Sequence, residues 1–167
     1  MIEASEELYV LLGRISMGME RVHHQLARLI SSMCCRHGKF SSVEQALTVA
    51  ISLRQITDLC EMLYLSNCEN KESKNEFRDL VKRVRSLEQK RNGVVHSVWM
   101  PTGDEGEFIK WKFKKDKQNG VALASEKFDY SEYQTIADQC FELEKELMLY
   151  VLKDFKRGGS PFHVHEL

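Results

Sequence analysis

The feature that most constrains the fold is a long apolar stripe that one arginine interrupts. Apolar side chains recur every three or four positions here, so at about 100° per residue they share one face of a helix. The stripe consists of Phe77, Leu80, Val81, Val84, Leu87, Val94, Val95 and Val98. Arg91 falls near its middle and Glu88 inside it, whereas Asn92 lies on its edge and His96 just beyond. An unpaired charge on a core-facing helix is costly, so Arg91 needs an explanation.

Two explanations of Arg91 stay open. Glu88 lies three residues earlier, so the two side chains are neighbours on one helix face and can form an ion pair. In a variant of this reading, Arg91 packs its aliphatic stem and extends its head into water. The other explanation is that the stripe packs against a partner surface and leaves a polar cleft in which Arg91, Asn92 and His96 converge. Spacing alone favours the ion pair.

A row of basic residues runs along one flank of the same predicted helix. It consists of Lys74, Arg78 and Arg85, followed by Asn92 and His96. A cationic row that ends at a titratable group suits a polyanion, whose phosphates the row would hold while the last residue does chemistry. A basic row alone is more often a solvated helix face. On the functional reading, Lys74, Arg78 and Arg85 are predicted to bind RNA.

Arg91, Asn92 and His96 form the pattern R-N-x-x-x-H. This pattern resembles the signature of the HEPN superfamily, small all-helical domains that include many bacterial RNases of toxin–antitoxin and phage-defence systems. The six residues lie near the end of a late helix, as in that family. The resemblance implies a metal-independent RNA endonuclease with no cofactor, acting as a homodimer whose two motifs meet across a two-fold axis. It implies catalytic roles for Arg91, Asn92 and His96.

The resemblance also suggests partners. RNA is the implied substrate, and an antitoxin or another defence-system protein is a further partner of such domains. In the subgroup controlled by a nucleotidyltransferase antitoxin, a tyrosine that becomes modified follows the histidine by two positions. Val98 occupies that position here, so control by that route does not follow from the resemblance.

The geometry of a helix agrees independently with a dimer. Arg91 and His96 project about 140° apart, so one helix does not easily aim both at a single phosphate, whereas two facing copies can. The unperturbed pKa of histidine is about 6.5, which suits His96 to remove the 2′-hydroxyl proton or to return a proton. Arg91 would hold the phosphate oxygens with its planar fork, and Asn92 would orient the phosphate or the histidine.

The whole chain sets further bounds. With 167 residues and a net charge of −1, it is predicted to form one domain, residues 1–167, without a global field that attracts nucleic acid. No apolar run approaches the roughly 20 residues of a membrane span. The first residues are acidic and do not resemble a secretory signal. Five cysteines without a disulfide spacing indicate reduced thiols, so we expect a cytoplasmic protein without membrane contact or a metal site.

The expected fold is all-α, a four-long-helix up-down bundle with a small β-hairpin inserted between the third and fourth helices. The helices are expected at about 4–35, 41–65, 72–98 and 129–156, with a flexible tail at about 158–167. Leu8, Leu12 and Ile15 begin a seam along the first helix, where Gly13 and Gly18 would permit a close neighbour. His23 and His24 lie beside this seam and are interpreted as surface or satisfied interface residues rather than catalytic ones.

The hairpin is expected at about 107–127. Ile109, Trp111 and Phe113 alternate with Lys110, Lys112 and Lys114, and Asn119-Gly120 favours a type I′ turn. The apolar face is expected to cover the bundle, which leaves the lysine face in solvent. Those lysines would either protect an exposed strand edge from aggregation or bind the RNA backbone, and the pattern favours neither.

Two other classes of function compete with the nuclease. One is a non-catalytic HEPN-like helical dimer that binds a nucleotide, an RNA or a protein partner. The other is a helical interaction module, in which the seam of the first helix is the functional surface and Arg91 pairs with Glu88. No P-loop, dinucleotide-binding glycine pattern or zinc-hydrolase motif occurs in the chain.

Overall fold

A long N-terminal helix, α1 (Glu3–Cys34), is the element around which the other helices pack. The structure is a computed structural model that describes residues 3–34, 40–102, 107–116 and 120–156, with side chains over 6–34, 42–102, 107–111 and 124–152. Within these residues the fold is mostly helical. After α1 come α2 (Phe40–Ala50), α3 (Leu53–Asn67), α4 (Lys71–Val95) and α5 (Tyr130–Lys156).

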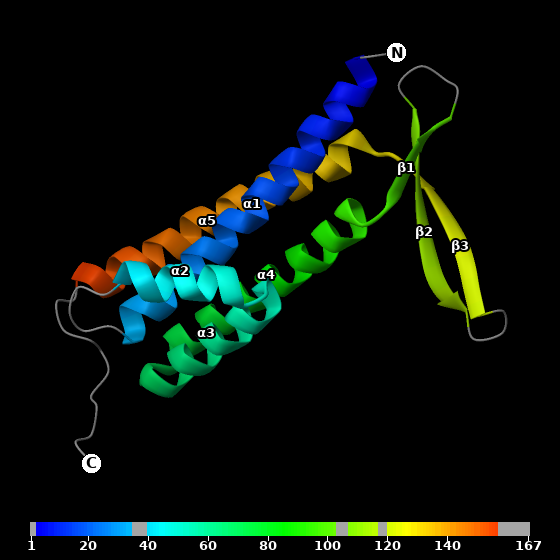
Figure 1. Cartoon of the computed structure of the whole chain (residues 1–167). Helices are drawn as coiled ribbons and strands as arrows, with labels where there is room; N and C mark the ends of the chain where they lie inside the picture. The colour runs from blue at the N-terminus through cyan, green and yellow to red at the C-terminus, as the bar shows by residue number, and fades with distance from the viewer. Residues whose placement is uncertain (1–2, 35–39, 103–106, 117–119, 157–167) are drawn as a thin grey trace.

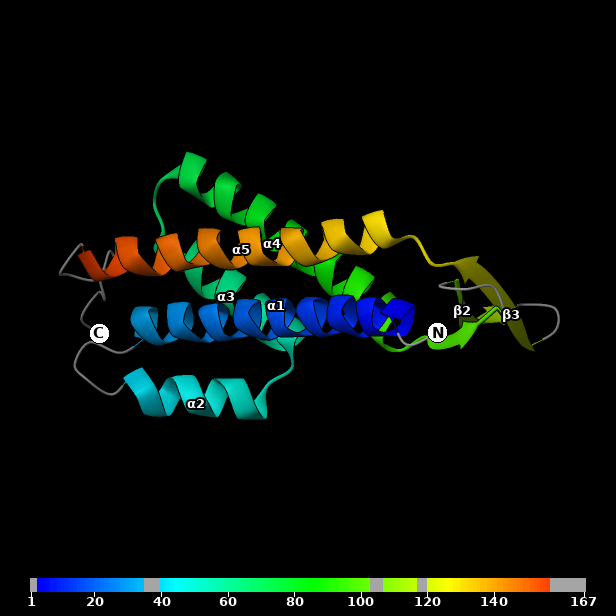
Figure 2. The same ribbon diagram turned by 90° about the horizontal axis from the view of Figure 1, so that it is seen from above.

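The described helices alternate in direction along the molecule (Figures 1 and 2). α1 and α5 run side by side away from the sheet, and α4 runs back toward it. α2 and α3 lie along the half of α1 that is far from the sheet, and α1 contacts α2, α3, α4 and α5. The helices therefore share one core, whose centre is the apolar face of α1.

The inward faces follow the predicted helical periods closely. In α5 the residues that recur at helical spacing are buried, namely Tyr133, Ile136, Ala137, Cys140, Leu143, Leu147 and Val151. In α4 the stripe from Phe77 to Leu87 and Val94 is buried as well. The seam of α1 is covered by α5 and the other helices of the same chain. It is therefore not available as the binding surface that a helical interaction module would need.

The prediction of one helix over about 41–65 is wrong. The structure has two helices there, because the chain reverses at Ile51 and Ser52. Ser52 is the N-cap of α3: its hydroxyl accepts a hydrogen bond from the Gln55 N–H, and the Gln55 side chain accepts one from the Ser52 N–H. This reciprocal cap satisfies two backbone donors and so starts a new helix. A helical fold is confirmed, but with five described helices rather than four.

A three-stranded antiparallel sheet follows α4, in the order β1-β2-β3. The predicted hairpin is present as β2 (Phe108–Asp116) and β3 (Gly120–Lys127), and its turn at 117–119 lies outside the described residues. The additional strand, β1 (Val98–Pro101), pairs with β2. α4 therefore ends at Val95, shorter than predicted. The expected tail at about 158–167 also lies outside the described residues.

The sheet is attached to the helices by aromatic side chains. Trp99 packs edge-on against Phe128 and Tyr133, whose rings stack on each other with centroids 5.2 Å apart. The Trp99 indole N–H donates to the Val94 carbonyl oxygen at 3.1 Å, which ties β1 to the end of α4. Such ring pairs stabilise beyond their buried area. The sheet is thus fixed at the point where α4 ends and α5 begins.

The two α1 glycines give the first testable prediction, because they differ in what surrounds them. A Cβ added at Gly18 would lie 2.7 Å from Cys140 Cβ on α5, whereas one added at Gly13 meets nothing within 4 Å. We expect Gly18→Ala to lower the free energy of unfolding by about 1–2 kcal/mol, since helix separation outweighs the better helix propensity of alanine. Urea denaturation measures this.

Gly13→Ala is the matched control, because only helix propensity changes there. It should raise the free energy of unfolding by roughly 0.5–1 kcal/mol. Equal effects of the two substitutions would contradict a close α1–α5 approach at Gly18.

Candidate functional site

The R-N-x-x-x-H residues lie at the end of α4, where the chain leaves the helical core for the sheet. Arg91 and Asn92 belong to the last turns of the helix, and His96 is its C-cap, with the His96 N–H directed at the Asn92 carbonyl oxygen at 3.3 Å. The helix ends here because β1 begins two residues later. The motif is therefore held by the junction of helix and sheet.

Arg91 has no carboxylate partner among the described residues. Its Nη1 donates to Asn92 Oδ1 at 3.0 Å, and its Nε is buried without a hydrogen-bond partner. No ion pair joins it to Glu88, so the ion-pair interpretation is wrong. Nε and Nη2 make no described hydrogen bond, and together they form the edge of the guanidinium that can hold an anion in a bidentate way.

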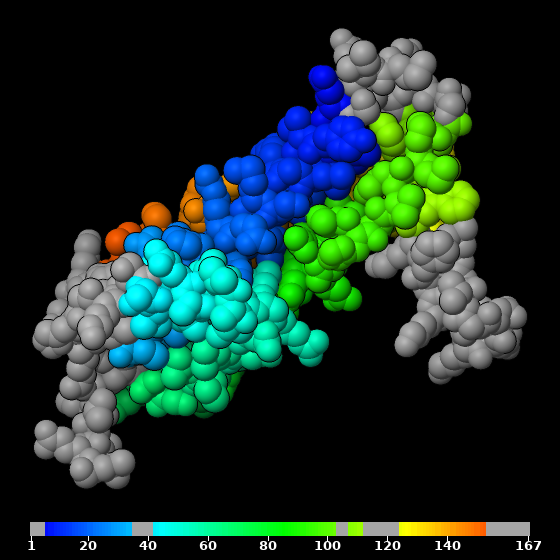
Figure 3. Space-filling view, in the orientation of Figure 1, coloured from blue at the N-terminus to red at the C-terminus, as the bar shows by residue number. Residues whose placement is uncertain are grey.

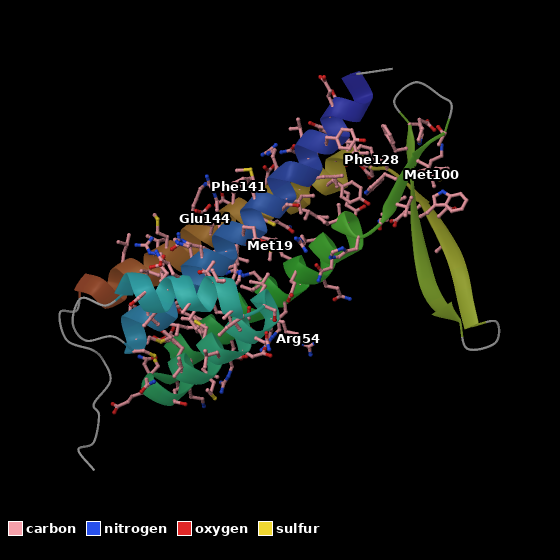
Figure 4. The ribbon with its side chains drawn as sticks, in the orientation of Figure 1. Met19, Arg54, Met100, Phe128, Phe141 and Glu144 are labelled. Carbon is pink, nitrogen blue, oxygen red and sulfur yellow. The ribbon has the colours of Figure 1, made fainter. Side chains whose placement is uncertain are left out.

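Arg91 and Asn92 line a pocket of about 390 Å³ between α1, the α2–α3 junction and α4. Residues of α1, α2, α3 and α4 line this pocket, among them Met19 and His23 of α1. In the face shown in Figure 3, α1, α2 and the second half of α4 lie next to one another. Figure 4 labels Met19, which lines the pocket on α1, and Arg54, which follows the lining residue Leu53 at the start of α3. The reversal at Ser52 brings the start of α3 to the motif.

His23 is the functional candidate that the sequence analysis missed. Its exposure is 8%, its Nε2 is buried without a partner, and its Nδ1 is 3.9 Å from Glu20 Oε2. The interpretation of His23 as a surface residue is therefore wrong, and within the described chain its Nε2 is not satisfied. The neighbouring His24 fits that interpretation, because it is exposed and lies 2.6 Å from Glu44. Adjacent histidines on one helix point to different environments, which sequence spacing beside the seam does not resolve.

His96 lies apart from this pocket. Its side chain is exposed, and it does not line the pocket that contains Arg91 and Asn92. The nearby Ser97 hydroxyl donates to the Gly93 carbonyl oxygen at 2.7 Å, so it closes the end of α4. Arg91 therefore lines the pocket beside α1, whereas His96 of the same chain is exposed outside it.

The basic row along α4 is interrupted by acidic partners. Arg85 lies 2.7 Å from both Asp58 and Glu61 of α3, and the hydrogen bonds that it donates to them raise the pKa of its guanidinium. Arg78 is exposed and donates to Asn75, and Lys74 is half-buried. The three predicted RNA-binding residues are thus not equivalent, because the charge of Arg85 is already balanced.

Lys110 lies in a different place from the one predicted. It is buried, its ammonium donates to the Tyr133 hydroxyl at 2.8 Å, and it pairs with Glu126 at 2.6 Å. The expectation that the lysine face of the hairpin is open to solvent is wrong at this position. Burial lowers the pKa of Lys110, but the hydrogen bonds with Glu126 and Tyr133 outweigh it and the pKa is raised. The side chains of Lys112 and Lys114 lie outside the described residues.

The described thiols and acidic clusters show no further chemistry. Cys60 and Cys140 are buried among apolar residues, and burial raises the pKa of the Cys140 thiol to about 11. Among the described side chains, no three His, Cys, Asp or Glu residues are grouped to hold a metal ion. None of the described helices is long and apolar enough to cross a bilayer.

Comparison with known proteins adds no relative. The chain matches no family model, and neither a curated protein nor a solved structure matches it.

The buried contact of Lys110 gives the second prediction. Lys110→Met keeps the aliphatic stem but leaves Glu126 and the Tyr133 hydroxyl without the ammonium, so it should lower the free energy of unfolding. We expect a loss of about 1–2 kcal/mol at neutral pH, below the value for a fully buried pair because Glu126 is 60% exposed. Urea denaturation with far-ultraviolet circular dichroism measures it.

Lys127→Met is the matched control, because the pair of Lys127 with Glu107 is exposed on the same sheet. It should change the free energy of unfolding by less than about 0.5 kcal/mol. Since the folded-state pKa of Lys110 is raised, its contribution is present below the unfolded pKa and is lost as pH rises through the folded value. Equal losses in both variants would contradict the anchoring role of Lys110.

Proposed function

We propose that this protein is a metal-independent RNA endonuclease of the toxin or phage-defence type, which acts as a homodimer with a composite Arg91, Asn92 and His96 site. The observation that carries the proposal is the unpaired guanidinium of Arg91 in a pocket beside the end of α4. A cation that forms no described ion pair in a partly buried site favours an anionic ligand. RNA supplies such an anion at each backbone phosphate.

The chemistry follows from the three side chains. His96 removes the proton of a 2′-hydroxyl, and the 2′-oxygen attacks the adjacent phosphorus. The bond to the 5′-oxygen breaks as that oxygen takes a proton from water. The Nε and Nη2 fork of Arg91 holds the non-bridging oxygens, whose charge grows in the transition state. Asn92 fixes the arginine through the 3.0 Å hydrogen bond. The products carry a 2′,3′-cyclic phosphate and a 5′-hydroxyl.

A second copy supports this chemistry in a way that one subunit does not. Arg91 and Asn92 line the pocket, whereas His96 lies outside it. Strand β1, directly after His96, is an edge of the described sheet, and its Val98 and Met100 side chains are exposed. Unpaired edge groups and apolar side chains favour contact with another chain. A copy that contacts this edge would bring its own motif toward His96.

A non-catalytic helical dimer that binds a nucleotide, an RNA or a protein is the second candidate. One observation favours it: no described hydrogen bond orients the exposed imidazole of His96, whereas catalytic bases are normally held by a third group. The paired state of Arg85 also weakens an RNA track along α4. Binding without cleavage would select this candidate.

Cleavage in the presence of EDTA is the direct test. We expect the purified protein to cut single-stranded RNA without added metal and to leave 2′,3′-cyclic phosphate ends. His96→Ala should lower the cleavage rate by at least about 100-fold, the usual size of a general acid–base contribution. His24→Ala is the control, because His24 is exposed and already lies against Glu44. Cutting that persists in His96→Ala, or that needs metal, would exclude the proposed site.

Subunit mixing tests whether the site is composite. Arg91→Ala and His96→Ala proteins should each be inactive, but mixed and refolded together they form heterodimers that contain one intact arginine and one intact histidine. RNA cleavage should therefore be partly restored in the mixture. If each subunit used its own Arg91 and His96, the mixture would stay inactive. Light scattering of the unmixed proteins checks that both variants still dimerise.

A further inference from the structure

We propose that the pocket between α1, the α2–α3 junction and α4 binds one phosphodiester group, held by His23, Arg91 and the N-terminus of α3. This inference deepens the proposed function, and rests on it for the choice of RNA, because it states where the RNA backbone enters each subunit. It adds a residue, His23, that lies 68 positions before Arg91 and outside the R-N-x-x-x-H pattern.

Two buried nitrogens without a described partner belong to side chains that line this pocket. His23 Nε2 and Arg91 Nε both lack a hydrogen bond to any described residue, and both side chains line the same cavity. Buried polar atoms are nearly always paired, so two orphaned nitrogens at one cavity mark a site that a ligand completes. Arg91 Nε always carries a hydrogen, and His23 Nε2 carries one as the Nε2–H tautomer or the imidazolium. Both then donate to an oxyanion.

The N-terminus of α3 adds a third favourable group. Ser52 and Leu53 line the pocket, and the Ser52 cap satisfies the Gln55 N–H but not the N–H groups of the first two helical residues. These free N–H groups and the helix dipole attract negative charge. The sharp reversal between α2 and α3 thus places a helix N-terminus opposite the guanidinium of Arg91.

The acidic residues of the pocket limit which anion fits. Glu20 and Glu88 also line it, and the side chain of Glu20 is 69% exposed, which places it at the rim. With these two carboxylates beside Arg91, a second negative charge on the ligand would be repelled. A phosphodiester carries one charge, whereas a phosphate monoester carries nearly two at neutral pH. The pocket therefore favours an internal RNA phosphate over a free or terminal one.

The test uses a ligand that cannot be cut. The probe is a 2′-O-methylated RNA dinucleotide, which has one phosphodiester and no 2′-hydroxyl, and the protein is the full chain with His96→Ala. We expect the probe to bind and to shift the His23 imidazole nitrogen resonances in a titration followed by nuclear magnetic resonance. His23→Phe in the same background should weaken binding at least tenfold by calorimetry, since it removes a hydrogen bond to a charged group.

His24→Phe is the matched control and should leave the affinity for the dinucleotide unchanged. Inorganic phosphate should bind more weakly than the dinucleotide at neutral pH, because of Glu20 and Glu88. Equal affinity of His23→Phe and its parent, absence of a His23 resonance shift, or tighter binding of inorganic phosphate would each overturn the site. If His23→Phe does not fold, the resonance titration with native His23 still decides.

The outcomes separate this site from the nuclease. If the dinucleotide binds but the unsubstituted protein cuts no RNA, the phosphodiester pocket is supported and the proposed nuclease activity is contradicted. If His96→Ala abolishes cleavage but His23→Phe changes neither KM nor kcat, the nuclease activity is supported. The proposed phosphodiester pocket is then contradicted.

Discussion

The close approach of α1 and α5 at Gly18 determines how the rest of the molecule packs. α1 is apolar over a wide arc, so it needs neighbours on several sides. Without a side chain at Gly18, α5 approaches until Cys140 occupies the space that a Cβ would fill. This contact sets the position of α5 along α1, and it thereby sets where Tyr133 lies at the other end of the same helix. The attachment of the sheet follows from that position.

The candidate site depends on a second constraint, the reversal of the chain at Ser52. An unbroken helix over 41–65 would extend past the motif and offer only side chains to it. Because Ser52 starts a new helix, the N-terminus of α3 faces α1 and α4 at the pocket. The resulting cavity combines a permanent cation, a titratable ring and a helix terminus, with two carboxylates around them. These groups come from three helices, α1, α3 and α4, so the pocket exists only in the folded chain.

Sequence patterns predicted the parts of the fold that depend on burial of a periodic face. The inward residues of α4 and α5 follow directly from spacing, because a helix must bury its apolar stripe. The break at Ser52 was missed because the apolar period continues through it from Leu47 to Leu53. In the sheet, a period of two separates the faces but does not tell which one packs. Lys110 faces inward since Glu126 and Tyr133 satisfy its ammonium.

The site was predictable only in part, because the spacing of residues along one helix does not show which surfaces pack against it. Arg91 was identified because a charge in an apolar stripe is anomalous within a single helix. His23 was not, because its unpaired nitrogen becomes an anomaly only when the opposing surfaces of α3 and α4 are known. Whether Arg91 paired with Glu88 also depended on side-chain directions that spacing does not contain.

The attachment of the sheet has a mechanical consequence for the end of α4. Only Ser97 separates His96 from β1. The Trp99 indole is hydrogen-bonded to the Val94 carbonyl oxygen and packs against the Tyr133 ring at the start of α5. Strands β1, β2 and β3 would therefore pivot about this aromatic cluster. A bound molecule or a neighbouring chain that displaced the described strands β2 and β3 would therefore also displace His96.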